Sequence, residues 1–233
     1  MLDLGTTDFY IAVPSMPRPE FERYSTHLFD QWDAYVERTL ALSDYSLALE
    51  VEEGSIKGVG RIAALVGAVY LGVGNYGSFI SGLQIIRGQV NAVGDFLAEQ
   101  AVTPFDSTVK PKVSKRGGDL SRLQRLFLKV QRAELTVEQA MTEAENILGD
   151  DAENSPEFMK KLEDSLHQTP RFHQQQMLPL DVVDFEDFTQ LNEKKKAPQS
   201  PLKKPDLPPP LHYRVEVWRD SKKESRRVRV VQL

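Results

Sequence analysis

Apolar and polar residues alternate with clear periods along the chain, and the period changes from segment to segment. Between residues 20 and 42 the apolar side chains recur every three or four positions, which is typical of an amphipathic helix with one buried face. From Asp44 to Val51 they alternate one by one, which predicts a half-buried strand. Phe9 to Val13 has strand propensity and stops at Pro14. These patterns predict a strand–helix–strand unit that leads into the apolar centre of the chain.

That apolar centre, residues 61–87, carries no charged residue between Arg61 and Arg87. A continuous helix over it would be about 37 Å long at ~1.5 Å per residue, which exceeds the ~30 Å hydrocarbon core of a bilayer. In lipid, stripes of small residues let helix backbones approach closely. The segment therefore predicts a transmembrane helix, or a tight helical hairpin, that packs against copies of itself. The residues expected to pack helices or line a pore are Ala64, Ala68, Gly72, Gly74, Asn75, Ser78 and Gly82.

The alternative interpretation of the same segment is a buried helical hairpin in a soluble protein. Two helices of about twelve residues that turn at Gly74 to Gly77 would each be too short to span a bilayer. Asn75 and Gln84 are ordinary in such a core, whereas in lipid they are costly unless they face a partner or a pore. Both interpretations remain open from the sequence.

The remainder of the chain divides by composition. Residues 1–106 form the first unit, and a further helix is expected over residues 89–102 before Pro104. Residues 107–118 are basic and rich in helix breakers, which favours a linker. Residues 119–168 predict a small helical unit, in which Thr136 and Gln139 have the spacing of a capping box. Residues 169–211 are acidic and then proline-rich, as in an extended linker, and residues 212–233 alternate as a β-hairpin. The predicted fold class is therefore α+β.

The C-terminal hairpin is the most basic part of the chain, with seven basic and three acidic residues from Tyr213 to Leu233. A hairpin alone is marginally stable, so this one is expected to join a sheet, its own or that of a neighbour. Basic side chains beside aromatic ones are typical of single-strand nucleic-acid binding; the alternative is a solvated face that protects a sheet edge. The candidate ligand-binding residues are Arg214, Trp218, Arg219, Arg226, Arg227 and Arg229.

Little in the composition points to catalysis. The formal net charge of −5 argues against a protein that binds nucleic acid over its whole surface. The absence of cysteine excludes thiolate chemistry. The loop from Gly54 to Arg61 fails the Walker spacing. The four histidines have no metal-binding spacing, and the acidic N-terminus does not predict a signal peptide. We therefore expect no enzyme activity, no cofactor and no metal.

Within residues 44–100, a strand that ends in Leu-Glu-Val-Glu-Glu-Gly-Ser-Ile-Lys-Gly precedes the apolar run, which contains Tyr-Gly-Ser-Phe-Ile-Ser-Gly at residues 76–82. This arrangement resembles the membrane channel effectors that are paired with a nucleotidyltransferase in Hailong-type bacterial anti-phage defence. The resemblance implies an oligomeric pore in the bacterial inner membrane, with its soluble parts in the cytoplasm, gated by a nucleotide or a short single-stranded DNA. Such a pore would depolarise an infected cell and so cause abortive infection. No ligand-binding residue of the family transfers to a position of this chain.

Two functions follow as expectations. The first is the pore-forming, homo-oligomeric membrane effector of anti-phage defence, with residues 61–87 in the bilayer. The alternative is a soluble, cytoplasmic and oligomeric adaptor or oligonucleotide-binding protein, with residues 61–87 as its buried core.

Overall fold

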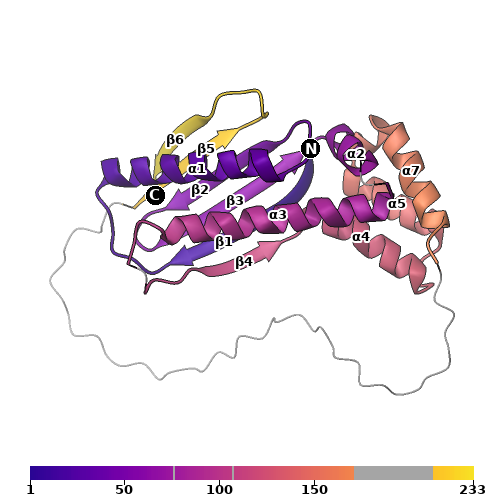
Figure 1. The fold of residues 1–233 in the computed structure, drawn as a ribbon, viewed down its shortest axis with the longest axis horizontal. Helices are drawn as coiled ribbons and strands as arrows, with labels where there is room; N and C mark the ends of the chain where they lie inside the picture. The colour runs from indigo at the N-terminus through magenta and orange to yellow at the C-terminus, as the bar shows by residue number, and fades with distance from the viewer. Residues whose placement is uncertain (76, 107, 171–211) are drawn as a thin grey trace, which may run out of the picture. The chain divides into compact units, whose positions relative to one another are not determined.

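Six strands form one antiparallel sheet in the order β4-β1-β3-β2-β5-β6 (Figure 1). The computed structural model describes residues 1–75, 77–106, 108–170 and 212–233. The strands are β1 (Leu2–Ile11), β2 (Ser46–Glu52), β3 (Ile56–Ala64), β4 (Lys112–Arg116), β5 (Tyr213–Arg219) and β6 (Arg227–Gln232). β4 and β6 are the two edge strands, so the ends of the sheet come from segments far apart in the chain.

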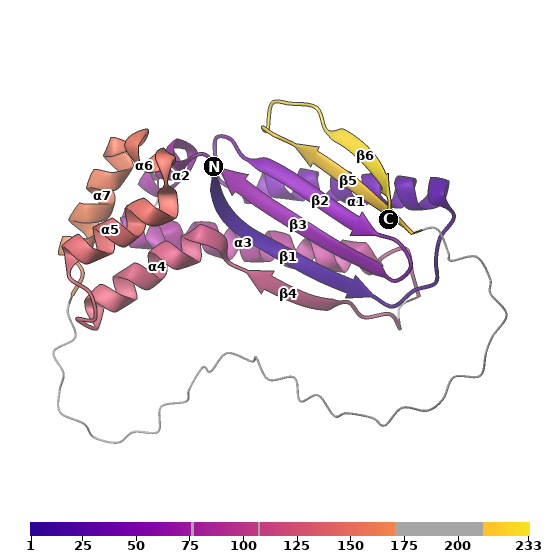
Figure 2. The same ribbon diagram turned by 180° about the vertical axis from the view of Figure 1, so that it is seen from behind.

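Two long helices cover one face of this sheet. α1 (Arg18–Thr39) and α3 (Phe79–Val102) lie side by side across it (Figure 1), whereas the view from behind shows none of the described helices over the other face (Figure 2). We call this second side of the sheet the open face. The other helices gather beyond the end of the sheet where β1 begins. They are α2 (Val66–Gly74), α4 (Gly118–Gln131), α5 (Val137–Leu148), α6 (Asp150–Glu153) and α7 (Pro156–His167).

The alternation of each central strand explains why the helices cover one face. Leu47, Leu49 and Val51 of β2 are buried, and the residues between them are partly exposed. Trp32 of α1 and Leu97 of α3 meet over Gly60 of β3, where an added Cβ would lie 2.4 Å from a Leu97 methyl carbon. The missing side chain at Gly60 therefore lets both helices lie close to the sheet, and burial of the apolar side chains between them stabilises the fold.

The apolar centre of the chain is not one helix, so this part of the transmembrane prediction is wrong. Residues 61–64 complete β3, residues 66–74 form α2, and α3 starts only at Phe79. In the part of the chain that the structure describes, no helix combines the length and the apolar character needed to cross a bilayer. The alternative placed a turn at residues 74–77, and the chain indeed turns there between α2 and α3. That alternative did not anticipate the strand.

The C-terminal hairpin joins the sheet of its own chain. β5 pairs with β2, with Val217 opposite Leu49 and Trp218 opposite Ala48, and β6 pairs with β5. Part of the segment predicted as a linker, residues 107–118, is instead strand β4, which pairs with β1. The capping box at Thr136 is confirmed, and Gly149 caps the C-terminal end of α5. The predicted linker over residues 169–211 lies almost entirely outside the described residues.

Candidate functional site

The open face presents its side chains in rows that run across the strands, because residues paired across an antiparallel sheet point to the same side. One row crosses the whole sheet and contains three arginines, one tryptophan and no carboxylate. At ~4.8 Å per strand it is about 24 Å long. We call it the arginine row; from β4 to β6 it consists of Arg116, Thr6, Arg61, Ala48, Trp218 and Arg227.

These three arginine side chains are held in place by carboxylates, which lie in the neighbouring row and in the hairpin turn. Arg116 donates to both carboxylate oxygens of Asp8 at 2.9 Å, and Arg61 lies 3.7 Å from Glu50. Arg227 bonds to Asp220 at 2.9 Å and Glu224 at 3.1 Å. The three arginine side chains remain 57–67% exposed. Exposed ion pairs contribute only ~0–1 kcal/mol each, so a phosphate can compete for these guanidinium groups.

Trp218 is the aromatic group of the arginine row. It is half-buried, and its neighbour across the strands on β2 is the small side chain of Ala48. The only other tryptophan, Trp32, is on the buried side of α1 and is 1% exposed. A second aromatic residue on the open face, Tyr10, lies one row from Asp8 and two rows from Thr6, with Lys112 Nζ 5.9 Å from its ring centre. The open face therefore combines stacking surfaces with exposed cations.

The structure divides the six ligand-binding residues predicted from the hairpin between the two faces. Arg214, Trp218, Arg227 and Arg229 alternate onto the open face. Arg219 and Arg226 instead pair with Asp33 and Asp30 of α1, so they lie on the helix side of the sheet; Arg219 is buried there, and Arg226 is partly exposed. The prediction did not include Arg61 and Arg116, because one was assigned to the apolar helix and the other to a linker.

Arg219 belongs to a buried ionic cluster under the hairpin. Its guanidinium lies 2.5 Å from Asp33 and donates to the Tyr45 hydroxyl at 3.2 Å. Burial raises the pKa of Asp33 although Arg219 acts in the opposite direction, and burial raises the pKa of Tyr45 to about 12. Asp44 lies next to this cluster. Burial alone would raise its pKa, but hydrogen bonds from the backbone N–H of Lys222, the Ser221 hydroxyl and the backbone N–H of Tyr45 outweigh this effect and lower the pKa. The cluster fastens the hairpin to α1.

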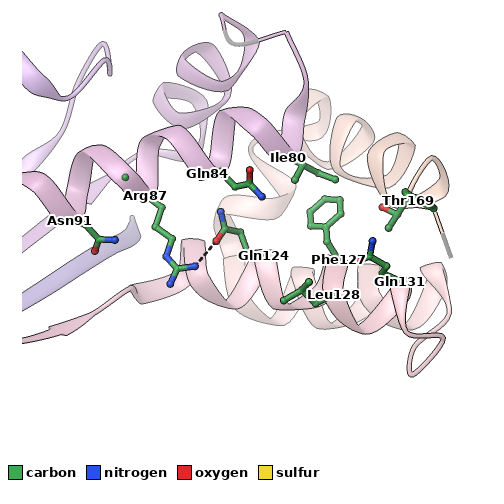
Figure 3. A pocket seen from close by; sticks show the side chains of 11 residues that line it. Ile80, Gln84, Arg87, Asn91, Gln124, Phe127, Leu128, Gln131 and Thr169 are labelled. Atoms are coloured by element: carbon green, nitrogen blue, oxygen red, sulfur yellow. Dashed lines mark hydrogen bonds between the residues drawn. The ribbon is translucent and has the colours of Figure 1, made fainter. Parts of the chain in front are cut away.

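A groove of about 610 Å³ lies between α3 and α4, and Figure 3 shows the side chains that line it. Arg87 of α3 reaches across to Gln124 of α4 and donates to its Oε1 at 2.8 Å. The other polar side chains of the lining are Gln84, Asn91, Gln131 and Thr169. Nothing in the sequence pattern marked this groove, because its two walls come from segments about 40 residues apart that pack together.

Four of the residues predicted to pack helices, Ala64, Ala68, Gly72 and Gly82, are buried within the chain itself. Ala64 is in β3, so it does not share a helical face with Ala68 and Gly72. A Cβ at Gly82 would lie 2.8 Å from Val73 Cα, and a Cβ at Gly72 would lie 2.8 Å from a Leu42 methyl carbon. The remaining three lie at the turn between α2 and α3, where Gly74 and Asn75 end α2 and Ser78 caps α3. No group of three potential ligands for a metal ion occurs within the described residues.

Known proteins do not test the interpretation of this chain as a membrane effector. The inner-membrane location, the homo-oligomer, the nucleotidyltransferase partner and the gating ligand all stay predictions from a resemblance in sequence. A comparison with protein-family models, with curated proteins and with solved structures finds no match to this chain.

Proposed function

We propose that the protein binds short single-stranded nucleic acid along the arginine row and that it acts by binding and not by catalysis. The observation that carries this proposal is the row itself: three exposed guanidinium groups and one tryptophan cross the open face of the sheet with no carboxylate in the row. Phosphates of an extended strand would lie along the guanidinium groups, and one base would stack on Trp218.

The dimensions support a short ligand. A row of about 24 Å accommodates roughly four nucleotides, the lower end of the site sizes known for single-strand binding domains. Stacking on one aromatic side chain contributes about 1–3 kcal/mol, and every base has a flat face, so little sequence preference is expected. The acidic row that includes Asp8, Glu50 and Glu216 lies beside the arginine row and would confine the backbone to one path across the sheet.

Tryptophan fluorescence tests the proposal directly, because Trp32 is buried and Trp218 is the partly exposed reporter. Titration with an eight-nucleotide oligothymidylate at low salt should quench the emission and saturate. The Trp218→Phe variant should lose the signal, and anisotropy of a labelled oligonucleotide should show weaker binding by this variant.

Two neighbouring arginines provide a matched pair of variants. Arg227→Gln removes a member of the arginine row, whereas Arg226→Gln removes the same charge from the side that faces Asp30 of α1. With about three phosphate contacts, log K should fall against log salt with a slope near −2, and Arg227→Gln should reduce its magnitude by about 0.7. The proposal is overturned if no oligonucleotide binds at low salt, or if both variants weaken binding equally.

A further inference from the structure

The groove between α3 and α4 has a lining with an unusual chemical composition. Carboxamide side chains lie seven residues apart on each wall, Gln84 and Asn91 on α3 and Gln124 and Gln131 on α4. Residues seven apart share a helical face, so each wall presents two amides in line. Arg87 is the only charged residue of the lining as the structure describes it. The groove is therefore a set of hydrogen-bonding groups around one positive charge.

Arg87 is positioned by an amide and not by an acid. Its guanidinium donates to Gln124 Oε1 at 2.8 Å, and it has no carboxylate partner within the described residues. A neutral acceptor orients the guanidinium without neutralising it, so its other N–H groups remain suited to a phosphate or a carboxylate.

Gln124 adds a second, independent sign of a ligand. Because Arg87 requires Oε1 of this side chain, the orientation of the amide is fixed, and Nε2 is the donor that remains (Figure 3). That nitrogen is buried and has no hydrogen-bond partner among the described residues. A buried donor without a partner costs about 1–3 kcal/mol. An acceptor atom of a bound molecule would offset this cost after a small shift of the Gln124 side chain that exposes Nε2 to the groove.

The apolar part of the lining suits a flat group. Phe127 forms part of the lining from α4, and its ring also packs against Phe79 with ring centres 6.2 Å apart. Leu128, which is 49% exposed, and Ile80 supply the apolar walls. The volume of about 610 Å³ lies within the range of small-molecule sites, which are mostly apolar with a few polar groups for orientation.

We propose that this groove binds a small organic anion, with its phosphate or carboxylate on Arg87 and a planar, hydrogen-bonding body between the carboxamides. An acceptor of that body lies at Gln124 Nε2, and its flat surface lies against Leu128 and Ile80. This site is separate from the arginine row, because none of its lining residues belongs to a strand.

Two probes each combine an anionic group with a flat, hydrogen-bonding body, and they differ in whether the anionic group is a phosphate or a carboxylate. Adenosine monophosphate carries a phosphate and a base, and hippurate carries a carboxylate and an aromatic amide. Calorimetric titration of the full chain with each should give saturable binding to one of them with a Kd below about 1 mM, equivalent to roughly −4 kcal/mol. Adenosine and benzamide, which lack the anionic group, should bind at least about tenfold more weakly. The preferred probe identifies the anion; absence of binding by both overturns the proposal.

Amino-acid substitutions test whether the ligand binds in this groove. Arg87→Gln should weaken binding about tenfold to a hundredfold, as expected for loss of a charged hydrogen bond. Leu128→Glu puts a carboxylate into the groove at a position that is 49% exposed, and it should have a similar effect. The control is Arg122→Gln, a charge change on α4 outside the groove, which should bind like the parent protein. Weaker binding by Arg227→Gln with normal binding by Arg87→Gln would place the anion on the sheet and overturn the proposal.

Discussion

Replacement of Arg219 by methionine tests whether this arginine stabilises the fold or binds a ligand. The sequence pattern placed it among the ligand-binding residues, whereas the structure places it 8% exposed against Asp33 of α1. Methionine retains the apolar part of the side chain and removes the charge. Asp33 then keeps a partly buried carboxylate with only the weaker attraction of Lys222 to balance it.

The structure allows an estimate of the cost. Removal of one partner of a buried ion pair costs about 3–5 kcal/mol. Asp33 retains 24% exposure of its side chain, so we expect the lower end, about 3 kcal/mol. For a chain of this size that corresponds to a fall of roughly 6–12 °C in Tm. The double variant Asp33→Leu/Arg219→Met should recover most of the loss, because no charge is then left without a partner.

The pH dependence provides a further check. In Arg219→Met the pKa of Asp33, already raised by burial, should rise further. A carboxyl group whose pKa is higher in the folded state favours folding where it is protonated, and this contribution is lost as the pH rises through its folded pKa. The deficit of the variant should therefore shrink as the pH is lowered from neutral towards the ordinary carboxyl range.

Urea unfolding at several pH values measures the stability, and anisotropy with labelled oligothymidylate measures binding by the folded protein. Binding should equal that of the parent protein, because Arg219 points away from the open face. A variant that keeps its full stability but loses affinity would refute the assignment of Arg219 to the structural cluster.

Three other predictions concern the fold. Gly82→Ala should destabilise by about 1–3 kcal/mol because its Cβ would meet the backbone of Val73, whereas Gly67→Ala, with open space around it, should stabilise by about 0.5–1 kcal/mol; thermal melts of the pair decide this, and equal shifts would contradict it. Asp44 has a lowered pKa, so its ionised carboxylate stabilises the folded state. This stabilisation should be full above the unfolded pKa of about 3.8 and should be lost as the pH falls through the folded pKa. Hydrogen exchange of the hairpin amides, compared between mildly acidic buffer and buffer below that unfolded pKa, should show less protection at the lower pH, and Asp44→Asn should abolish the difference. Thr136→Ala removes the capping box and should cost about 1 kcal/mol in urea unfolding; no change would argue against the cap.

Local patterns predicted the elements whose signals are local. The three-and-four spacing before residue 42, the alternation around Leu49 and the capping box at Thr136 each depend on neighbours within one or two turns, and the structure has all three. β3 was missed for a physical reason. Gly58 and Gly60 lower the strand propensity of residues 56–64, and only the pairing with β1 and β2 makes them a strand.

The charge-free centre was misinterpreted for a related reason. Many of its apolar residues are buried in three elements in turn, a central strand, a short helix and the start of a long helix, although Leu65, Leu71 and Ile85 are exposed. A hydropathy pattern does not distinguish these from one continuous buried helix.

The arginine row illustrates what a sequence pattern can supply for a site. Alternation in the hairpin is enough to place Trp218 and Arg227 on one face and Arg219 on the other. Arg61 and Arg116 join that row only through strand register, which depends on pairings between segments distant in the chain. The groove at Arg87 depends on helix packing and had no local signal at all.

The position of β5 in the sheet has a consequence for how the chain folds. β5 covers the edge of β2, although Leu49 and its partner Val217 lie far apart in the sequence. During synthesis β2 and its apolar face exist long before their last neighbour leaves the ribosome, and an uncovered strand edge pairs readily with other chains. Pairing over such a distance also slows folding. A chain truncated before β5 should therefore aggregate, and the final step of folding should be the closure of the hairpin over β2 and α1.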